Sequence, residues 1–178
     1  MTDYQLGNIS DWSALILPQV YEEVPYKNGD GDLRMKRRPK GYVFVTDPKY
    51  GPRAQWKLPA GHKADGESPL ETAMRELLGE TNLSAPIENF RYIDKWIGWR
   101  KDHWKMLFLA NIEESELGWM NDQHPENEGE QPKFFTTEEF YALVREGKFM
   151  REHYEKLVEF ATILPFSRDR APQTTTVA

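Results

Sequence analysis

Several segments of the chain alternate hydrophobic and polar residues with the two-residue period of β-strands. Leu33 and Met35 alternate with basic residues, which predicts a half-buried strand. A second strand is predicted over residues 41–47, which are rich in valine and aromatic residues, and residues 91–98 alternate again. Residues 105–112 contain a continuous apolar run, which is typical of a central strand buried on both faces. Two short strands are predicted over residues 55–58 and 133–135.

The helical period predicts one well-defined helix in the middle of the chain. Ser68 can cap its N-terminus, Pro69 suits the first helical position, and Glu71 completes a capping box. We therefore expect a helix over residues 69–81. Its apolar positions follow the i, i+3, i+4, i+7, i+8 pattern and form one buried stripe. They are Leu70, Ala73, Met74, Leu77 and Leu78.

Later elements complete the predicted architecture. Thr136 and Glu139 form a second capping box, which opens a helix that ends near Gly147. A final helix is predicted over residues 152–164, and Pro165 stops it. Strands on both sides of a central helix, with further helices at the end, predict an α/β fold with a mixed sheet between helical layers.

Two acidic residues of the central helix suggest metal chemistry. Glu76 and Glu80 lie four residues apart on the side opposite the apolar stripe, so their carboxylates are neighbours. Two close carboxylates repel each other unless a cation lies between them. Mg²⁺ suits such a pair because it takes hard oxygen ligands and retains waters and substrate phosphates. A solvated helix face is the alternative interpretation of two glutamates taken alone.

The spacing around this pair resembles the Nudix box, Gly-x5-Glu-x7-Arg-Glu-apolar-x-Glu-Glu-x-Gly-apolar. Gly61 lies six residues before Glu67, Arg75 and Glu76 come next in the pattern, and Glu80 follows one turn later. The resemblance implies a Nudix-type α/β/α sandwich, with a mixed central sheet flanked by helices. It also implies a pyrophosphohydrolase that uses Mg²⁺, with Mn²⁺ as a substitute.

The segment 61–83 departs from the family pattern at two positions. Gly79 stands where the family usually has the first of two consecutive glutamates, so one carboxylate commonly used around the metals is absent. Asn82 replaces the closing glycine, which is a mild change because asparagine tolerates the left-handed conformation after a helix. Just before the box, Ala60 replaces a common glycine and still supplies a backbone carbonyl.

The resemblance assigns roles to the residues that match the box. Glu76, Glu80 and the backbone carbonyl of Ala60 are implied as metal ligands, and Glu76 and Arg75 are also counted among the catalytic residues. Arg75 is implied to orient the helix carboxylates through Glu67. Gly61 provides the turn before the helix.

A long acidic connection over residues 114–132 is the second informative region. Loops of this length without secondary structure are uncommon in compact domains and are usually functional or disordered. In Nudix proteins a loop in this position often carries a carboxylate that binds metal or takes a proton from water. The resemblance therefore implies Glu128 or Glu130 as the general base. A solvated acidic loop is the alternative.

Aromatic and basic residues outside the box are candidates for substrate contact. A nucleobase could stack on Trp96 or Trp99, which lie on or beside a predicted hairpin, although core packing is the alternative role. Arg38 belongs to a basic run over residues 34–40 that could hold substrate phosphates. The alternative for this run is an edge strand that uses charge to resist aggregation.

Composition limits the functions that the chain can have. A chain of 178 residues is expected to form one domain, assigned to residues 1–170, with residues 171–178 as a disordered tail. The net charge of −6 disfavours non-specific binding to nucleic acid. The absence of cysteine excludes disulfides, thiol nucleophiles and zinc-thiolate sites. Since neither a signal-like start nor a membrane-length apolar run is found, we expect a cytoplasmic location without membrane association.

The sequence thus predicts a Nudix pyrophosphohydrolase that acts on a nucleoside diphosphate linked to another group. Nucleotide sugars, nucleoside triphosphates and dinucleoside polyphosphates are all open as its small-molecule substrate, and a homodimer is compatible with this interpretation. The rival interpretation is a catalytically weakened Nudix domain that binds a nucleotide or acts as a sensor module. Gly79 is the main support for that rival.

Overall fold

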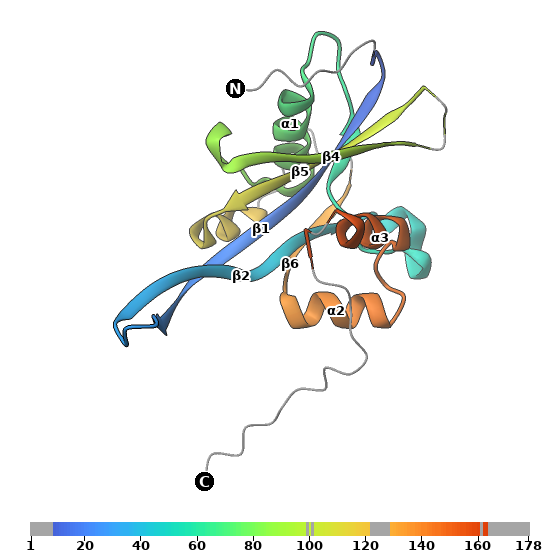
Figure 1. Cartoon of the computed structure of the whole chain (residues 1–178). Helices are drawn as coiled ribbons and strands as arrows, with labels where there is room; N and C mark the ends of the chain where they lie inside the picture. The colour runs from blue at the N-terminus through green and yellow to red at the C-terminus, as the bar shows by residue number, and fades with distance from the viewer. Residues whose placement is uncertain (1–8, 99, 101, 122–128, 161, 164–178) are drawn as a thin grey trace.

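A mixed β-sheet forms the centre of the computed structural model, which describes residues 9–98, 100, 102–121, 129–160 and 162–163. The strand order is β4-β5-β1-β2-β6, and β3 pairs with β1 beside this path (Figure 1). Strands β1 and β5 run parallel, whereas the other pairs are antiparallel. The strands are β1 (Trp12–Lys27), β2 (Leu33–Thr46), β3 (Ala60–His62), β4 (Phe90–Ile97), β5 (Trp104–Ile112) and β6 (Gln131–Thr136). The predicted mixed sheet is confirmed.

Helices cover both faces of this sheet (Figure 1). Ala73 and Leu77 of the first α-helix pack in one hydrophobic cluster, and Phe140 and Leu157 of the other two pack in a second. The helices are α1 (Pro69–Thr81), α2 (Thr137–Arg145) and α3 (Arg151–Glu159), with the 3-10 segments η1 (Pro48–Arg53), η2 (Ile87–Asn89) and η3 (Glu114–Asn121). The α/β/α layering is therefore as predicted. None of the described helices has the length and apolar character needed to cross a membrane.

Strand β1 is the middle strand of the sheet, and the sequence reasoning missed it. Its residues 12–20 are all buried, since Ile16 faces the α1 cluster and Leu17 faces the α2 and α3 cluster. A strand covered on both faces has no polar alternation, so only its apolar run could have revealed it. The predicted central strand at 105–112 is confirmed as β5, which pairs with β1 on one side and β4 on the other.

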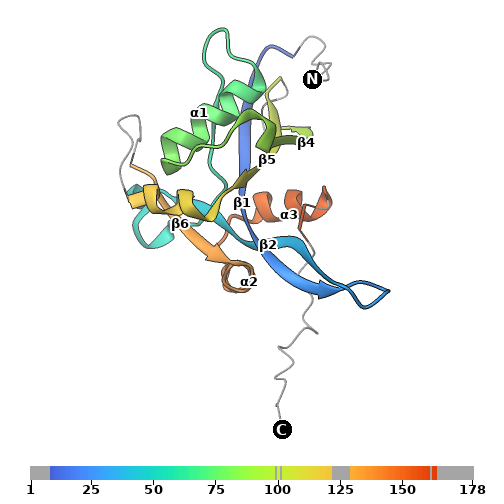
Figure 2. The ribbon, with the colours of Figure 1, turned by 90° about the vertical axis from the view of Figure 1, so that its left-hand side faces the viewer.

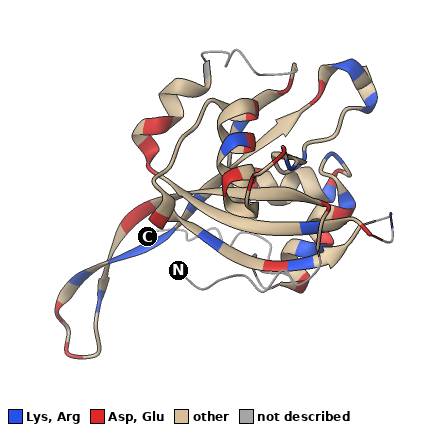
Figure 3. Ribbon diagram, turned by 90° about the horizontal axis from the view of Figure 1, so that it is seen from above, with Lys and Arg blue, Asp and Glu red and all other residues tan. Residues whose placement is uncertain are grey.

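The far halves of β1 and β2 project from the body as a two-stranded hairpin, which carries many charged residues (Figures 2 and 3). The predicted strands around residues 33–36 and over 41–47 are parts of the single strand β2. Leu33 and Met35 are 72% and 55% exposed, so the prediction that they are half-buried was wrong. Their alternation correctly indicated a strand, but the hairpin extends beyond the helices that would have covered one face.

The predicted start and end of helix α1 are confirmed. The Ser68 side chain accepts a hydrogen bond from the Glu71 backbone N–H, and the Glu71 carboxylate accepts one from the Ser68 backbone N–H. Asn82 ends the helix in the left-handed conformation, with φ of 55°. The second capping box, of Thr136 and Glu139, likewise opens α2. These boundaries depend on contacts within one or two turns.

Three other sequence predictions need correction. Residues 55–58 form no strand and make only isolated bridges, from Trp56 to Phe149 and from Lys57 to Val45 of β2. The first part of the connection predicted to be a loop is the 3-10 segment η3. The last helix ends at Glu159, well before Pro165, because the Thr162 backbone and hydroxyl groups both donate to the Leu157 carbonyl.

Candidate active site

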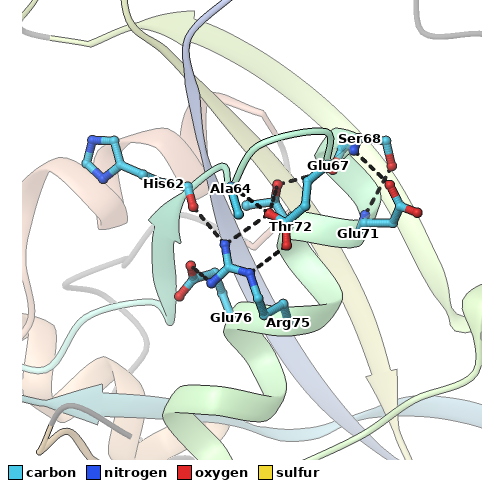
Figure 4. Close-up of polar contacts among 8 residues, drawn as sticks. All are labelled: His62, Ala64, Glu67, Ser68, Glu71, Thr72, Arg75 and Glu76. Atoms are coloured by element: carbon cyan, nitrogen blue, oxygen red, sulfur yellow. Dashed lines mark hydrogen bonds and ion pairs between the residues drawn. The ribbon is translucent and has the colours of Figure 1, made fainter. Parts of the chain in front are cut away.

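Arg75 joins the glycine turn to helix α1 through a set of charged hydrogen bonds (Figure 4). Its Nε and Nη2 donate to the two carboxylate oxygens of Glu67 at 2.6 and 3.0 Å. Its Nη1 donates to Glu76 Oε1 at 2.5 Å, and Nη2 also donates to the His62 carbonyl at 2.8 Å. Hydrogen bonding to Arg75 is the main cause that lowers the pKa of Glu67 to about 2. Arg75 therefore holds Glu67, Glu76 and the turn in one arrangement.

Gly61 is required by the position of the Glu76 carboxylate. A Cβ atom at residue 61 would lie 2.1 Å from both Cδ and Oε1 of Glu76, which is far inside van der Waals contact. Gly61 itself is fixed because it pairs with Ala14 of β1 in the β3 ladder. The glycine of the box thus lets a helix carboxylate lie directly against the backbone of the turn.

Glu80 is buried rather than solvated. The Ala60 backbone N–H donates to Glu80 Oε2 at 3.0 Å, and Lys57 Nζ lies 3.8 Å from Glu80 Oε1. Burial is the main cause that raises the pKa of Glu80 to about 8, against the opposing effects of Lys57 and the Ala60 N–H. The negative charges of Glu130 and Glu76 raise this pKa further. The alternative interpretation, a solvated helix face, is therefore wrong for Glu80, because the turn before α1 covers its side chain.

Glu130, in the segment just before β6, lies close to Lys57 and Glu80. Lys57 Nζ lies 3.9 Å from Glu130 Oε1, and the Glu130 side chain is only 9% exposed. This proximity follows from the sheet, since Val45 of β2 pairs with both Lys57 and Pro132. The loop carboxylate predicted at residue 130 is therefore brought close to the Glu80 carboxylate. Glu128, the other predicted base, lies outside the described residues.

The structure does not bring the other predicted substrate contacts to these carboxylates. Trp96 lies on β4, at the opposite edge of the sheet from β6, and packs against Phe160 with ring centroids 5.7 Å apart. Arg38 lies on the projecting hairpin, where its Nε donates to Glu22 at 2.7 Å. Trp99 lies outside the described residues. The site instead contains Lys57, which the sequence reasoning did not select although it lies three residues before Ala60.

The donor set has the chemistry of a site for a hard divalent cation. Glu76 and Glu80 from α1, with Glu130 from the segment before β6, are carboxylates of the kind that Mg²⁺ prefers. Among the described residues, no three His, Asp or Glu side chains are arranged closely enough to hold a metal ion as they stand. The Lys57 ammonium is the positive charge found between Glu80 and Glu130. The residues therefore fit a divalent cation in type and charge.

Solved structures of other proteins share this fold. The chain resembles a mutT/nudix family protein from Listeria innocua with a TM-score of 0.55 and 14% identity, over 86% of this chain and 92% of that one. It resembles a NUDIX hydrolase from Nitrosomonas europaea with a TM-score of 0.53 and 15% identity, over 85% and 88% of the two chains. At these identities the likeness concerns the fold alone.

Comparison of this sequence with those of known proteins identifies the same family. Phosphatase NudJ of Escherichia coli is 33% identical over 76 residues, which cover 42% of this chain and 50% of that protein. The same match is found with Phosphatase NudJ of Shigella flexneri, so the chain spans about half the length of the curated relatives it matches. The NUDIX domain matches residues 27–157, which is most of the chain and includes α1, Glu76, Glu80 and Glu130. The chain therefore belongs to the Nudix family.

Proposed function

We propose that this chain is a divalent-metal-dependent pyrophosphohydrolase that cleaves a nucleoside diphosphate linked to another group. One observation carries the proposal: Glu76 and Glu80 of α1 and Glu130 before β6 are gathered around the glycine turn, although they come from distant parts of the sequence. A cluster of largely buried carboxylates is unfavourable for folding, so its presence in a Nudix domain indicates a functional site.

Glu76, Glu80 and the Ala60 carbonyl are the proposed metal ligands, with Mg²⁺ as the cation and Mn²⁺ as its substitute. A bound Mg²⁺ would supply positive charge that offsets the charge developing on the diphosphate. Arg75 is a positioning residue, because its bonds to Glu67 and Glu76 fix the carboxylate before any ligand arrives. This fixed arrangement lowers the reorganisation needed at the moment of reaction.

Glu130 is the proposed general base, with Glu128 as the other candidate. The carboxylate takes a proton from the water that attacks phosphorus, and the phosphoanhydride oxygen leaves with the electron pair of the broken bond. The closeness of Glu130 to Glu80, on a segment separate from α1, supports this role. The same base could not be supplied by Glu76 or Glu80 while they serve as ligands.

The substrate panel should cover nucleotide sugars, nucleoside triphosphates and dinucleoside polyphosphates, each with Mg²⁺, with Mn²⁺ and with chelator. Inorganic phosphate should be measured directly and after an added enzyme that acts only on the products, which is alkaline phosphatase for nucleotide sugars and dinucleoside polyphosphates and inorganic pyrophosphatase for nucleoside triphosphates. Phosphate released directly would indicate a phosphatase activity, as the name Phosphatase NudJ implies for that relative. Phosphate released only after the added enzyme would indicate cleavage inside the diphosphate. No metal-dependent turnover of any substrate would contradict the proposal.

A matched variant tests the metal assignment. Glu80→Gln keeps the shape of the side chain and an acceptor for the Ala60 N–H, but it removes the charge. We expect most Mg²⁺ binding and activity to be lost while the circular dichroism spectrum stays unchanged. Isothermal titration with Mg²⁺ or Mn²⁺ measures the affinity. An unchanged affinity in this variant would show that Glu80 is not a ligand.

The second candidate function is a catalytically weakened Nudix domain that binds a nucleotide as a sensor. The observation that favours it is Gly79, which lacks the family's usual carboxylate; among the described residues nothing lies within 4 Å of a Cβ atom added there. Titration of the same nucleotide panel separates the two functions. Nucleotide binding without turnover favours the sensor, and turnover favours the enzyme. A cytoplasmic location and a homodimer stay predictions.

A further inference from the structure

Lys57 lies between two buried carboxylates that come from different parts of the fold. Its Nζ is 3.8 Å from Glu80 Oε1 and 3.9 Å from Glu130 Oε1. The side chains of Lys57, Glu80 and Glu130 are 23%, 11% and 9% exposed, so the three ionisable groups are largely shielded from water. Charges in such a place interact more strongly than on the surface, and burial of a lysine of this kind needs an explanation.

Backbone hydrogen bonds determine that the Lys57 side chain lies between Glu80 and Glu130. Lys57 and Val45 exchange two hydrogen bonds, at 2.9 and 3.0 Å, which fix the segment against β2. Trp56 and Leu58 pack in the α2 and α3 cluster, so the alternation of an extended chain sends Lys57 to the opposite face, where α1 lies. The position of the ammonium is therefore determined by the sheet and does not depend on a flexible surface loop.

The two distances show how the ammonium interacts. Both exceed the range of a normal hydrogen bond, so Lys57 is shared between two anions rather than bound tightly to one. A lysine ammonium is a compact point charge on a flexible stem and can exchange partners readily. Lys57 thus offsets part of the negative charge of Glu80 and Glu130 without a short hydrogen bond to either carboxylate.

We propose that Lys57 is an exchangeable counter-ion of the metal site. In the metal-free protein it holds Glu80 and Glu130 together, and it withdraws from them when a divalent cation binds. This inference rests on the proposed function in taking Glu80 as a metal ligand and Glu130 as a neighbouring carboxylate of the same site. An arriving diphosphate offers the withdrawn ammonium a new partner, so metal and diphosphate should bind cooperatively.

The variant Lys57→Met tests the exchange, because methionine has a similar length and no charge. In EDTA at about pH 9, above the pKa of Glu80, its melting temperature should be below that of the wild type, since two buried carboxylates lose their counter-ion. Its Mn²⁺ affinity, measured by isothermal titration without substrate, should be higher by on the order of tenfold, because the cation no longer displaces an ammonium. Melting with and without Mn²⁺ should show a larger gap than in the wild type.

Matched variants separate this effect from general loss of charge. Lys57→Arg keeps the charge and should retain the metal-free melting temperature of the wild type. Lys148→Met removes a 64% exposed lysine that pairs with Glu146 outside the site, and it should leave both measurements unchanged. If Lys57→Met fails to fold, Lys57→Gln provides the same comparison with a polar side chain.

The cooperativity is measured with methylenediphosphonate, a diphosphate analogue that is not hydrolysed. It should tighten Mn²⁺ binding to the wild type and have a smaller effect in Lys57→Met. A folded Lys57→Met or Lys57→Gln with unchanged or weaker Mn²⁺ affinity overturns the inference, even if the wild type hydrolyses its substrate. Tighter metal binding in a protein that hydrolyses nothing on the panel would support the exchange and contradict the proposed activity. No metal binding by either protein overturns both.

Discussion

The substitution Gly61→Ala probes the contact between the glycine turn and helix α1. The new Cβ would lie 2.1 Å from Glu76 Cδ and 2.3 Å from Glu76 Oε2, where about 3.4 Å is the ordinary limit. The carboxylate must therefore move by more than about 1 Å. Because it is the end of a flexible side chain, we expect the fold to survive. The movement breaks the 2.5 Å hydrogen bond from Arg75 Nη1 to Glu76.

The size of the effect follows from that lost bond and from the displaced ligand. A charge-assisted hydrogen bond contributes about 1.5–3 kcal/mol, which corresponds to a decrease in Tm of roughly 3–12 °C for a chain of this size. A misplacement of about 1 Å in a catalytic group can cost roughly a hundredfold in rate. We therefore expect kcat/KM to decrease by about that factor, while circular dichroism stays that of a folded protein.

The assay is steady-state kinetics on the substrate that the panel identifies, with calorimetric melting in parallel. Gly29→Ala is the matched control, because nothing lies within 4 Å of its added Cβ. Combining Gly61→Ala with Glu76→Ala removes the clash, so the double variant should be no less stable than Glu76→Ala alone. Wild-type kcat/KM and Mg²⁺ affinity in Gly61→Ala would refute the reasoning, because they would show that Glu76 works equally well from another position.

Three further predictions concern the base, the missing carboxylate and the pH dependence of stability. Either Glu130→Gln or Glu128→Gln should lower kcat by roughly a hundredfold with a smaller effect on KM, and wild-type turnover in both single variants and the double variant would place the base elsewhere. Gly79→Glu should raise kcat and give a higher Tm with Mg²⁺ than without it; a loss of activity on the native substrate would show that the glycine makes room for a substrate group. His153 is buried and accepts a hydrogen bond from the Leu58 N–H, and burial lowers its pKa to about 4, below its ordinary value of 6.5. The unfolded chain therefore binds this proton first as the pH falls, so the stabilising contribution is complete above pH 6.5 and decreases by about 3 kcal/mol as the pH approaches 4. Urea unfolding of the wild type and His153→Asn between pH 7.5 and 4.5 checks this, and an equally steep loss in both proteins would exclude His153 as the cause.

Local chemistry made part of this protein predictable from the sequence. The bounds of α1 and the start of α2 depend on capping residues within three positions of each other, so no distant contact was needed to find them. The spacing of Gly61, Glu67, Arg75 and Glu76 could be compared with a family pattern for the same reason. The bidentate contact between Arg75 and Glu67 joins residues eight positions apart, on the turn and the helix that follows it.

Features that depend on distant segments were decided only by the tertiary structure. Strand β1 lacks polar alternation because helices cover both of its faces, and Leu33 is exposed because its hairpin extends past those helices. The burial of Glu80 results from the turn that covers it. Lys57 meets Glu130 because both segments pair with β2, although 73 residues separate them in the sequence. The sequence alone determined which carboxylates the helix carries, and the packing of the sheet decided which other charges lie beside them.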